Sequence, residues 1–432
     1  MKIIIILLDG LGDRAYPELK HLTPLQAAKT PNLDYLAAGG SNGLFHASYP
    51  GQCLPSEIAH FLLFGYNLED FPGRGLLEAI GEGIPYEQED AICLAHLCGI
   101  EWQNGIAVLK RGRDEIMGTR EAIGQIYSLI DRFEKDKLLI RLEQTRRNDA
   151  VLVLSGAVSH CISDSDPMRQ GRPVAQIKPL GSPSNYKAKR TAEILNDYLR
   201  YCYGILNDPA KNPYRDKIPA NFLVTQRCGK HRTLIPFQSL WGLRGAVIAS
   251  PSVYAGLASE VGLDFIQAED TSSPEKDMRD RIAYAIADAE HDFLHVHTKL
   301  PDKIAHKGDP RQKQDIISLL DRSMDQLVKT MQHGDDILLA VTADHSTPSG
   351  SPLIHSGEPV PVLINGPNVR RDNVQKFDEI EAACGCLGML RGREVMAMLL
   401  NYANRSVLYS HRLGAVERSC FPLKYQPFRQ PL

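Results

Sequence analysis

Three carboxylates in the sequence each follow a short apolar run: Asp9, Asp302 and Asp344. Runs of this kind, bounded by Gly, Pro and Ser, are typical of buried strands. Parallel strands bring their C-terminal ends to one edge of a sheet, so we expect the three acids to converge there. Clustered carboxylates raise one another's pKa unless a cation neutralises them. The pattern therefore predicts a metal site at the edge of a sheet.

Three histidines stand close to two of these acids. His306 follows Asp302 by four residues, so both face the same way on one helical turn. His345 is adjacent to Asp344 and points in a different direction, and His355 lies further along the same loop. Acids and imidazoles without Cys suit Mn²⁺, Zn²⁺ or Mg²⁺ better than a soft metal. We predict two divalent ions, about 3.5–4 Å apart as in other two-metal sites.

Ser56 is the predicted nucleophile. It stands where a turn-rich loop, residues 49–60, becomes a helix. Taken alone, a serine there is typical of a simple helix N-cap. Two metal ions would lower the pKa of its hydroxyl and bind both oxygens of an in-line phosphoryl transfer. The acids and histidines at the three strand ends favour this second interpretation.

Strands and helices alternate at both ends of the chain. This alternation predicts an α/β fold whose mostly parallel sheet is flanked by helices. The predicted strands are residues 2–8, 243–249, 292–296, 337–341 and 360–364. The predicted helices are residues 31–38, 254–260 and 315–332, of which the first ends at Gly39 and the last at Gly334.

The character of the sequence changes after about residue 85. Short apolar runs at 91–97, 105–109 and 151–154 lie between charged segments, and residues 113–133 and 191–206 are helix-like. We therefore predict an inserted, smaller α+β domain at 86–237. The core would be discontinuous, residues 1–85 and 238–415, with hinges near 85 and 238 and a C-terminal tail at 416–432.

Composition excludes some partners. The net charge of −3 gives no electrostatic case for nucleic acid or membrane binding, and no apolar run approaches membrane-spanning length. The nine cysteines are scattered and odd in number, as in a reduced cytoplasmic protein. Residues 1–8 read as a first strand and not as a signal peptide. The expected partner is a small phosphorylated metabolite.

Eight stretches of the chain resemble the archaeal-type cofactor-independent phosphoglycerate mutases, which belong to the alkaline phosphatase superfamily. The resemblance spans residue 1 to about 410 and is specific in the metal motifs. The stretches are residues 9–14, 23–34, 55–60, 73–75, 299–309, 344–348, 355–361 and 387–393. The resemblance implies an alkaline-phosphatase-like fold and a glycolytic isomerase that converts 3-phosphoglycerate to 2-phosphoglycerate.

The resemblance also implies a role for each site residue. Ser56 would carry the phosphoryl group as a phosphoserine. The ions, Mn²⁺ or Zn²⁺ with Mg²⁺ or Co²⁺ as alternatives, would be held in two sets. One set is Asp9, Ser56, Asp344 and His345, and the other is Asp302, His306 and His355.

The inserted region is expected to bind the substrate and departs in part from the family pattern. The acidic turn with Asp164 and Asp166 is kept, and Arg227 stands in the segment that matches a family Arg-Gly-Ala-Gly sequence. Arg111 and Arg113 are further predicted contacts, for which solvated surface charge is an equal interpretation. The segment 251–256 lacks the lysine that the family has after the preceding strand.

Two alternative functions therefore remain open. The first is a phosphohydrolase or phosphonate-cleaving enzyme on the same scaffold, with a different substrate. The second is a non-catalytic relative, which would require a lost ligand or nucleophile. All seven metal and nucleophile positions hold competent residue types, which disfavours the non-catalytic alternative.

Overall fold

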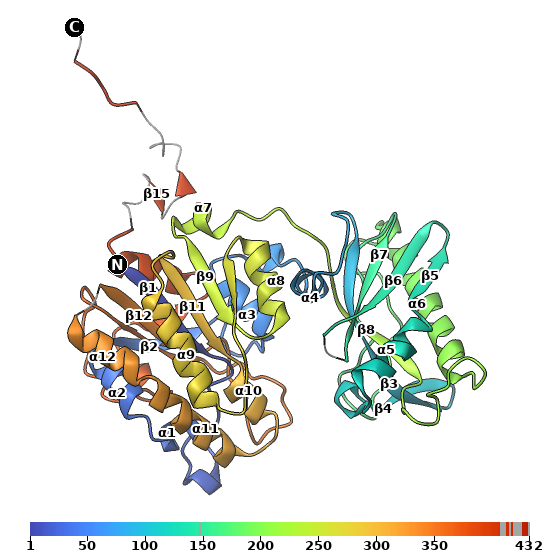
Figure 1. Cartoon of the computed structure of the whole chain (residues 1–432), viewed down its shortest axis with the longest axis horizontal. Helices are drawn as coiled ribbons and strands as arrows, with labels where there is room; N and C mark the ends of the chain where they lie inside the picture. Colours follow the sequence, from blue (N-terminus) through green and yellow to red (C-terminus); the bar gives the residue numbers. More distant parts are fainter. Residues whose placement is uncertain (147, 335, 407–411, 414–415, 418–425, 431–432) are drawn as a thin grey trace. The chain divides into compact units, whose positions relative to one another are not determined.

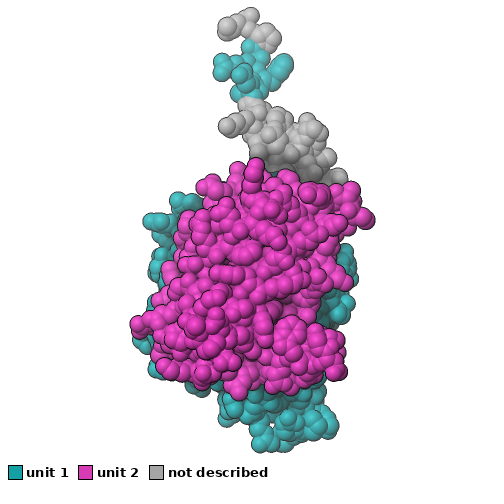
Figure 2. Space-filling model, turned by 90° about the vertical axis from the view of Figure 1, so that its right-hand side faces the viewer, with its two compact units in different colours: residues 1–71, 234–432 teal, residues 72–233 magenta. Residues whose placement is uncertain are grey.

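The computed structural model describes residues 1–146, 148–334, 336–406, 412–413, 416–417 and 426–430. These residues form two compact units, one of residues 1–71 and 234–432 and the other of residues 72–233 (Figure 2). We predicted boundaries at 85 and 238. The helix α4 (Arg74–Glu82) packs with strands of the second unit, which moves the first boundary to an earlier residue. Most of the predicted tail lies outside the described residues.

An eight-stranded sheet of order β10-β9-β11-β1-β12-β13-β2-β14 forms the first unit. Only β13 among these described strands runs antiparallel to its neighbours, so the predicted mostly parallel sheet is confirmed. The strands are β1 (Lys2–Leu8), β2 (Ser41–His46), β9 (Gly245–Ala249), β10 (Asp264–Gln267), β11 (Phe293–Thr298), β12 (Ile337–Thr342), β13 (Val360–Asn365) and β14 (Gly388–Arg391).

Strand β1 lies at the centre of this sheet. Its residues from Ile3 to Leu7 are fully buried, because helices cover both faces. Because neither face of such a strand meets solvent, apolar and polar residues do not alternate along it, which explains the unbroken apolar run. Ile5 pairs with His295 of β11 on one side and with Ala340 of β12 on the other. The C-terminal ends of the three strands therefore reach one edge together.

Helices flank the sheet on both sides, as predicted. α8 (Ser252–Val261) and α9 (Pro274–Ala287) make successive crossovers in opposite directions along the sheet, so right-handed connections place them on opposite faces. α9 packs against α11 (Pro310–Ser323), and both lie over one face in Figure 1. The remaining helices of this unit are α1 (Pro24–Ala27), α2 (Pro31–Ala38), α3 (Ser56–Leu63), α7 (Phe237–Trp241), α10 (Leu300–Ala305), α12 (Asp325–His333) and α13 (Glu394–Tyr402).

The predicted single helix at 315–332 was wrong in its extent. It begins earlier, at Pro310, because the Asp309 carboxylate caps its first backbone N–H groups. It is also divided into α11 and α12 at Met324, whose N–H donates to Asp321 O at 2.9 Å. A bond over three residues tightens the last turn and ends the first helix.

The second unit is an antiparallel sheet of order β4-β3-β7-β6-β5, with β8 also paired to β3. Alternate residues of β3 face two cores, with Cys93 and Ala95 in the larger one under α5 and α6. Ile92 faces the smaller core with Leu76 and Ala79 of α4. The elements are β3 (Ala91–Gln103), β4 (Ile106–Arg111), α5 (Arg120–Ser128), β5 (Arg132–Lys135), β6 (Leu138–Gln144), β7 (Ala150–Ser155), α6 (Tyr186–Asn207) and β8 (Phe222–Gly229).

The predicted helix at 113–133 was too long. α5 starts only after Thr119, whose hydroxyl accepts a hydrogen bond from Ala122 N at 3.2 Å. The chain then leaves the helix to form β5, which pairs with β6. Tertiary pairing overrode a local helical pattern here.

Short elements complete the described chain. The 3-10 helices are η1 (Pro17–Leu19), η2 (Leu68–Asp70), η3 (Arg113–Glu115) and η4 (Ala382–Cys384). The two-residue strands β15 (Arg412–Leu413) and β16 (Val416–Glu417) pair with each other. Among the described residues, no helix combines the length and apolarity needed to cross a bilayer.

Candidate active site

Three carboxylates converge at the C-terminal edge of β1, β11 and β12. Asp9 follows β1 directly, and its backbone oxygen accepts a hydrogen bond from Asp302 N at 3.0 Å. Gly10 N donates to Asp344 Oδ1, also at 3.0 Å. All three acids are almost fully buried. The structure thus brings together the residues that sequence spacing placed at one rim.

Gly10 makes this close approach possible. Its φ of +67° is in the left-handed region that favours glycine. A Cβ at this position would lie 2.6 Å from Thr347 Oγ1 and 2.7 Å from Asp302 Cβ. A larger residue would therefore push apart the loops that carry the acids.

The antiparallel direction of β13 explains the position of His355. β13 starts at the edge where β12 ends, so the loop between them begins and ends at the same rim. Ser356 N donates to Ser346 O at 2.9 Å and closes this loop. As a result the rings of His345 and His355 stack, with their centroids 3.7 Å apart.

His306 and His355 approach the same carboxylate oxygen. Asp302 Oδ1 lies 3.3 Å from His306 Nε2 and 3.5 Å from His355 Nε2. His306 reaches it from one turn along α10, as the four-residue spacing predicted. Its side chain is 40% exposed, so this side of the site is open to solvent.

The Ser56 hydroxyl lies between the acids and His345. Ser56 is the first residue of α3, and the N-cap residue is Pro55. Its Oγ lies 3.0 Å from His345 Nε2 and donates to Asp9 Oδ1 at 3.5 Å. The hydroxyl is therefore directed at the acid cluster and does not cap its own helix.

The donor set fits divalent metal ions. Donor atoms of Asp9, Asp344 and His345 lie within 4.8 Å of one another, as do those of Asp302, His345 and His355. Asp344 Oδ2 is buried and accepts no hydrogen bond from the described residues, although His345 Nε2 lies 3.1 Å away. Buried oxygens of this kind are normally satisfied, and a cation would satisfy this one. His345 belongs to both groups, whereas the sequence assigned it to one.

Asp9 and Asp302 are ionised, which also favours binding of a cation. Burial alone would raise the pKa of Asp9, but the Lys299 ammonium and a hydrogen bond from His297 hold that pKa below its ordinary value. Burial likewise opposes ionisation of Asp302, and its bonds to His306 and His355 outweigh it and lower the pKa. Both groups are therefore carboxylates at neutral pH and available as ligands.

Three side chains at this rim were not assigned from the sequence. Tyr254 OH donates to Asp9 Oδ2 at 2.9 Å, and His297 Nε2 lies 3.0 Å from the same oxygen. Lys299 contacts Asp9 and Asp302. The signal for Lys299 and His297 was their position at the end of β11. Tyr254 gave no such signal, because only the fold brings α8 beside Asp9.

Three of the predicted substrate-binding residues lie together in the second unit. Arg227 N donates to Asp164 Oδ1 at 2.6 Å, with the backbone of Arg227 at a φ of +51°. Asp166 Oδ2 lies 3.0 Å from His96 Nε2, and this bond helps to keep the Asp166 pKa low despite burial. The turn is thus fixed against β3 and β8.

The other two predicted contacts have surface positions. Arg111 is exposed at the end of β4. Arg113 pairs with Asp149 at 3.4 Å and with Asp114 at 3.5 Å. The exposure of Arg111 and the partners of Arg113 agree with the interpretation of both arginines as solvated surface charge.

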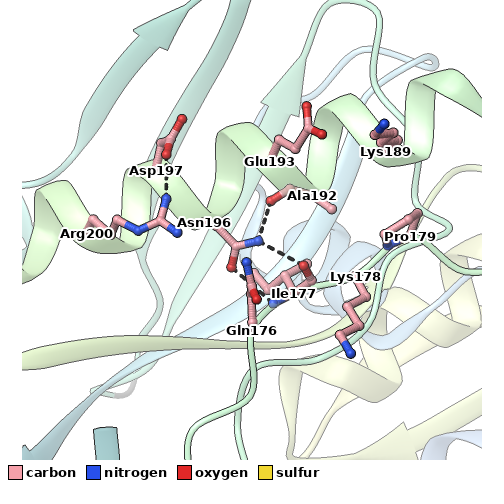
Figure 3. Close-up of a pocket in the computed structure, with 10 residues that line it drawn as sticks. All are labelled: Gln176, Ile177, Lys178, Pro179, Lys189, Ala192, Glu193, Asn196, Asp197 and Arg200. Carbon is pink, nitrogen blue, oxygen red and sulfur yellow. Dashed lines mark hydrogen bonds and ion pairs between the residues drawn. The ribbon is translucent and has the colours of Figure 1, made fainter. Parts of the chain in front are cut away.

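A cavity in the second unit lies between α6 and residues 176–179 (Figure 3). Its central polar residue is Asn196, whose amide donates to the carbonyl oxygens of Ile177 and Ala192, both at 2.8 Å. Asn196 Oδ1 in turn accepts from Ile177 N at 3.0 Å. These bonds hold residues 176–179 against α6. The polar side chain of Asn196 in the wall of the cavity therefore has a structural role.

The sequence is similar to known proteins over most of its length. The profile of the metalloenzyme superfamily matches residues 1–402. The 2,3-bisphosphoglycerate-independent phosphoglycerate mutase 2 of Methanocaldococcus jannaschii is 41% identical over 428 residues, 96% of each chain. The resemblance seen in the sequence motifs is confirmed by this match.

Solved structures also match most of this chain. The PH0037 protein from Pyrococcus horikoshii has a TM-score of 0.73 at 27% identity and covers 94% of this chain and 98% of its own. The cofactor-independent phosphoglycerate mutase from Thermoplasma acidophilum has a TM-score of 0.60 at 30% identity, with 93% and 100% covered. The chain belongs to the 2,3-bisphosphoglycerate-independent phosphoglycerate mutase family of the metalloenzyme superfamily.

Proposed function

We propose that this protein interconverts 3-phosphoglycerate and 2-phosphoglycerate by metal-dependent phosphoryl transfer through Ser56. The main support is the position of the Ser56 hydroxyl, 3.0 Å from His345 Nε2 and next to Asp9, in a chain so similar to a named mutase. A serine oxygen beside clustered metal ligands is the arrangement that covalent phosphoryl transfer needs.

Two ions are proposed, with Mn²⁺ or Zn²⁺ preferred. The oxygen and nitrogen donors of the site suit these ions. When bound, they would lower the pKa of the serine hydroxyl and neutralise charge on the phosphoryl oxygens. The proposed ligands are Asp9, Ser56, Asp344 and His345 for one ion, and Asp302, His306 and His355 for the other.

The reaction consists of two transfers that mirror each other. The Ser56 Oγ–P bond forms as the bond between phosphorus and the substrate oxygen breaks, and the serine proton ends on the freed glycerate hydroxyl. The other glycerate hydroxyl then attacks the phosphoserine, and its proton returns to Ser56. No phosphate is released, so water must be kept from the phosphoserine.

Recognition of glycerate is proposed for the cluster of Asp164, Asp166 and Arg227. Its carboxylates can accept hydrogen bonds from the glycerate hydroxyls, and the arginine carries a charge opposite to that of the substrate. His96 fixes Asp166 for this purpose, at 3.0 Å. Arg111 and Arg113 are not included, since both are exposed and Arg113 pairs with Asp149.

A second candidate function is hydrolysis of a different phosphate ester. The observation that favours it is the segment 251–256, which has no lysine and instead places the neutral Tyr254 hydroxyl on Asp9. A weaker hold on the phosphoryl group would let water compete for the phosphoserine.

A coupled assay tests both functions. The protein, loaded with Mn²⁺, is given 3-phosphoglycerate with excess enolase, and phosphate release is followed in parallel. We expect isomerisation far faster than phosphate release, and no turnover by Ser56→Ala. Ser273→Ala is the control, because Ser273 is an exposed serine at a helix start that makes no side-chain cap bond. Phosphate release without isomerisation would favour the hydrolase.

A further inference from the structure

Lys299 is a cation held at the reacting oxygen. Its Nζ lies 3.0 Å from Ser56 Oγ, 2.9 Å from Asp302 Oδ2 and 3.1 Å from Asp9 Oδ2. An ammonium has three N–H donors, and these three contacts use them all. The backbone fixes its origin, because Lys299 immediately follows β11 and is the N-cap residue of α10.

The charges around Lys299 explain its position. Asp9, Asp302 and Asp344 together carry three negative charges in a buried cluster, and the ammonium offsets one of them. The same carboxylates are the proposed ligands of divalent ions. Divalent ions bound to these oxygens would repel the Lys299 ammonium, because two cations on the same carboxylates lie only a few ångströms apart. With such ions bound, Lys299 would leave the carboxylates, and its flexible four-carbon stem would let it stay beside Ser56.

We propose that Lys299 is a catalytic residue, which binds a non-bridging oxygen of the phosphoryl group as it moves to and from Ser56 Oγ. This inference rests on the proposed function. Lys299 keeps its proton throughout and forms no covalent bond, so it supplies charge and orientation only. A phosphoryl group at Ser56 brings about two negative charges to within a hydrogen bond of Nζ.

Other contacts of the hydroxyl do not offer this charge. Among the described residues, Ser56 Oγ also contacts Asp9 and His345, of which the first is anionic and the second is a proposed metal ligand. Tyr254 is neutral and bonded to Asp9. Lys303, one turn further along α10, is exposed to solvent. Lys299 is thus placed to supply a permanent positive charge to the reacting group.

The test compares Lys299→Met with the matched control Lys303→Met. Binding of inorganic phosphate to the Mn²⁺-loaded proteins is measured by calorimetry, bound metal by elemental analysis, and kcat by the coupled assay. We expect Lys299→Met to bind phosphate at least tenfold more weakly and to lose about 10²–10³-fold in kcat, as when one preorganised donor is removed. Its Mn²⁺ affinity stays equal or rises, since no ammonium competes for the carboxylates. Lys303→Met stays near wild type in all three.

Two results would overturn the proposal. Phosphate affinity and kcat within threefold of wild type would mean that Lys299 only offsets charge in the metal-free protein. Loss of bound Mn²⁺ would mean that it supports the metal site instead. If Lys299→Met does not fold, Lys299→Gln keeps a polar donor without the charge and is judged by the same criteria. The phosphate titration needs no isomerisation, so it remains decisive even if the proposed mutase activity fails.

Discussion

At the scale of single residues, burial changes the protonation of Glu379, which contacts Asp13. Its Oε2 accepts a hydrogen bond from Thr23 Oγ1 at 2.8 Å, and its Oε1 accepts from Asp13 N at 3.2 Å. Burial raises the pKa of this carboxyl to about 7, and the hydrogen bonds only partly oppose it. The folded protein therefore favours the protonated acid more than the unfolded chain does.

Glu379→Gln is expected to remove a pH dependence of stability. With a folded pKa above the unfolded one, the stabilising contribution is complete below about pH 4.5 and is lost as pH rises to about 7. Glutamine is neutral throughout. The melting temperature of the wild type, relative to that of Glu379→Gln, should therefore be lower at pH 8 than at pH 5. An equal difference at both pH values would contradict the prediction.

At the scale of elements, α11 joins two of the loops that carry the site. The Lys313 ammonium is fully buried and pairs with Asp13 Oδ2 at 3.0 Å. It also donates to Gly12 O at 3.0 Å and to Thr347 O at 2.8 Å. One side chain thus ties the loop after β1 to the loop after β12, and with them the segments that bear Asp9 and Asp344.

Lys313→Met should destabilise the protein strongly. It leaves the Asp13 carboxylate buried without its cation, a loss that costs about 3–5 kcal/mol. Urea unfolding measures the change. Lys329→Met is the control, since Lys329 is exposed in a surface pair with Asp325 and should cost no more than about 0.5 kcal/mol. Asp13→Asn combined with Lys313→Met should recover part of the loss, and a double variant as unstable as the single one would argue against this account.

Local sequence signals predicted several elements near the site. Features that depend on contacts between distant parts of the chain could not be predicted in this way. Pro31 and Gly39 bound α2, and the four-residue spacing from Asp302 to His306 gave the turn of α10. The direction of β13 has no local signal, because a buried apolar run reads the same either way. The same limit hid the contact of Tyr254 with Asp9. The split at Met324 has a different origin, a local bond over three residues that the apolar pattern does not mark.

At the scale of the whole molecule, the site is a product of the complete first unit. Asp9 and Ser56 lie near the start of the sequence, and Asp302, Asp344 and His355 lie more than 240 residues later. The unfolded chain has no such site, so metal binding stabilises the native state by linkage.

Divalent metal should therefore raise the melting temperature. Mn²⁺ at 100 times its Kd adds about 2.7 kcal/mol of stability, and EDTA should reverse the shift. Differential scanning calorimetry of the wild type and of Asp344→Asn makes the comparison. The variant lacks one proposed ligand and should show a much smaller shift, whereas an equal shift in both would place the stabilising ion elsewhere.

The central position of β1 has a consequence for synthesis. β1 leaves the ribosome long before its neighbours in the sheet, β11 and β12, which begin at Phe293 and Ile337. At about 5–20 residues per second, the first strand waits roughly 15–60 s for a partner. The second unit, residues 72–233, is complete well before then. Until then the apolar segment of β1, IIIILL, lacks its partners in the sheet and is prone to aggregate.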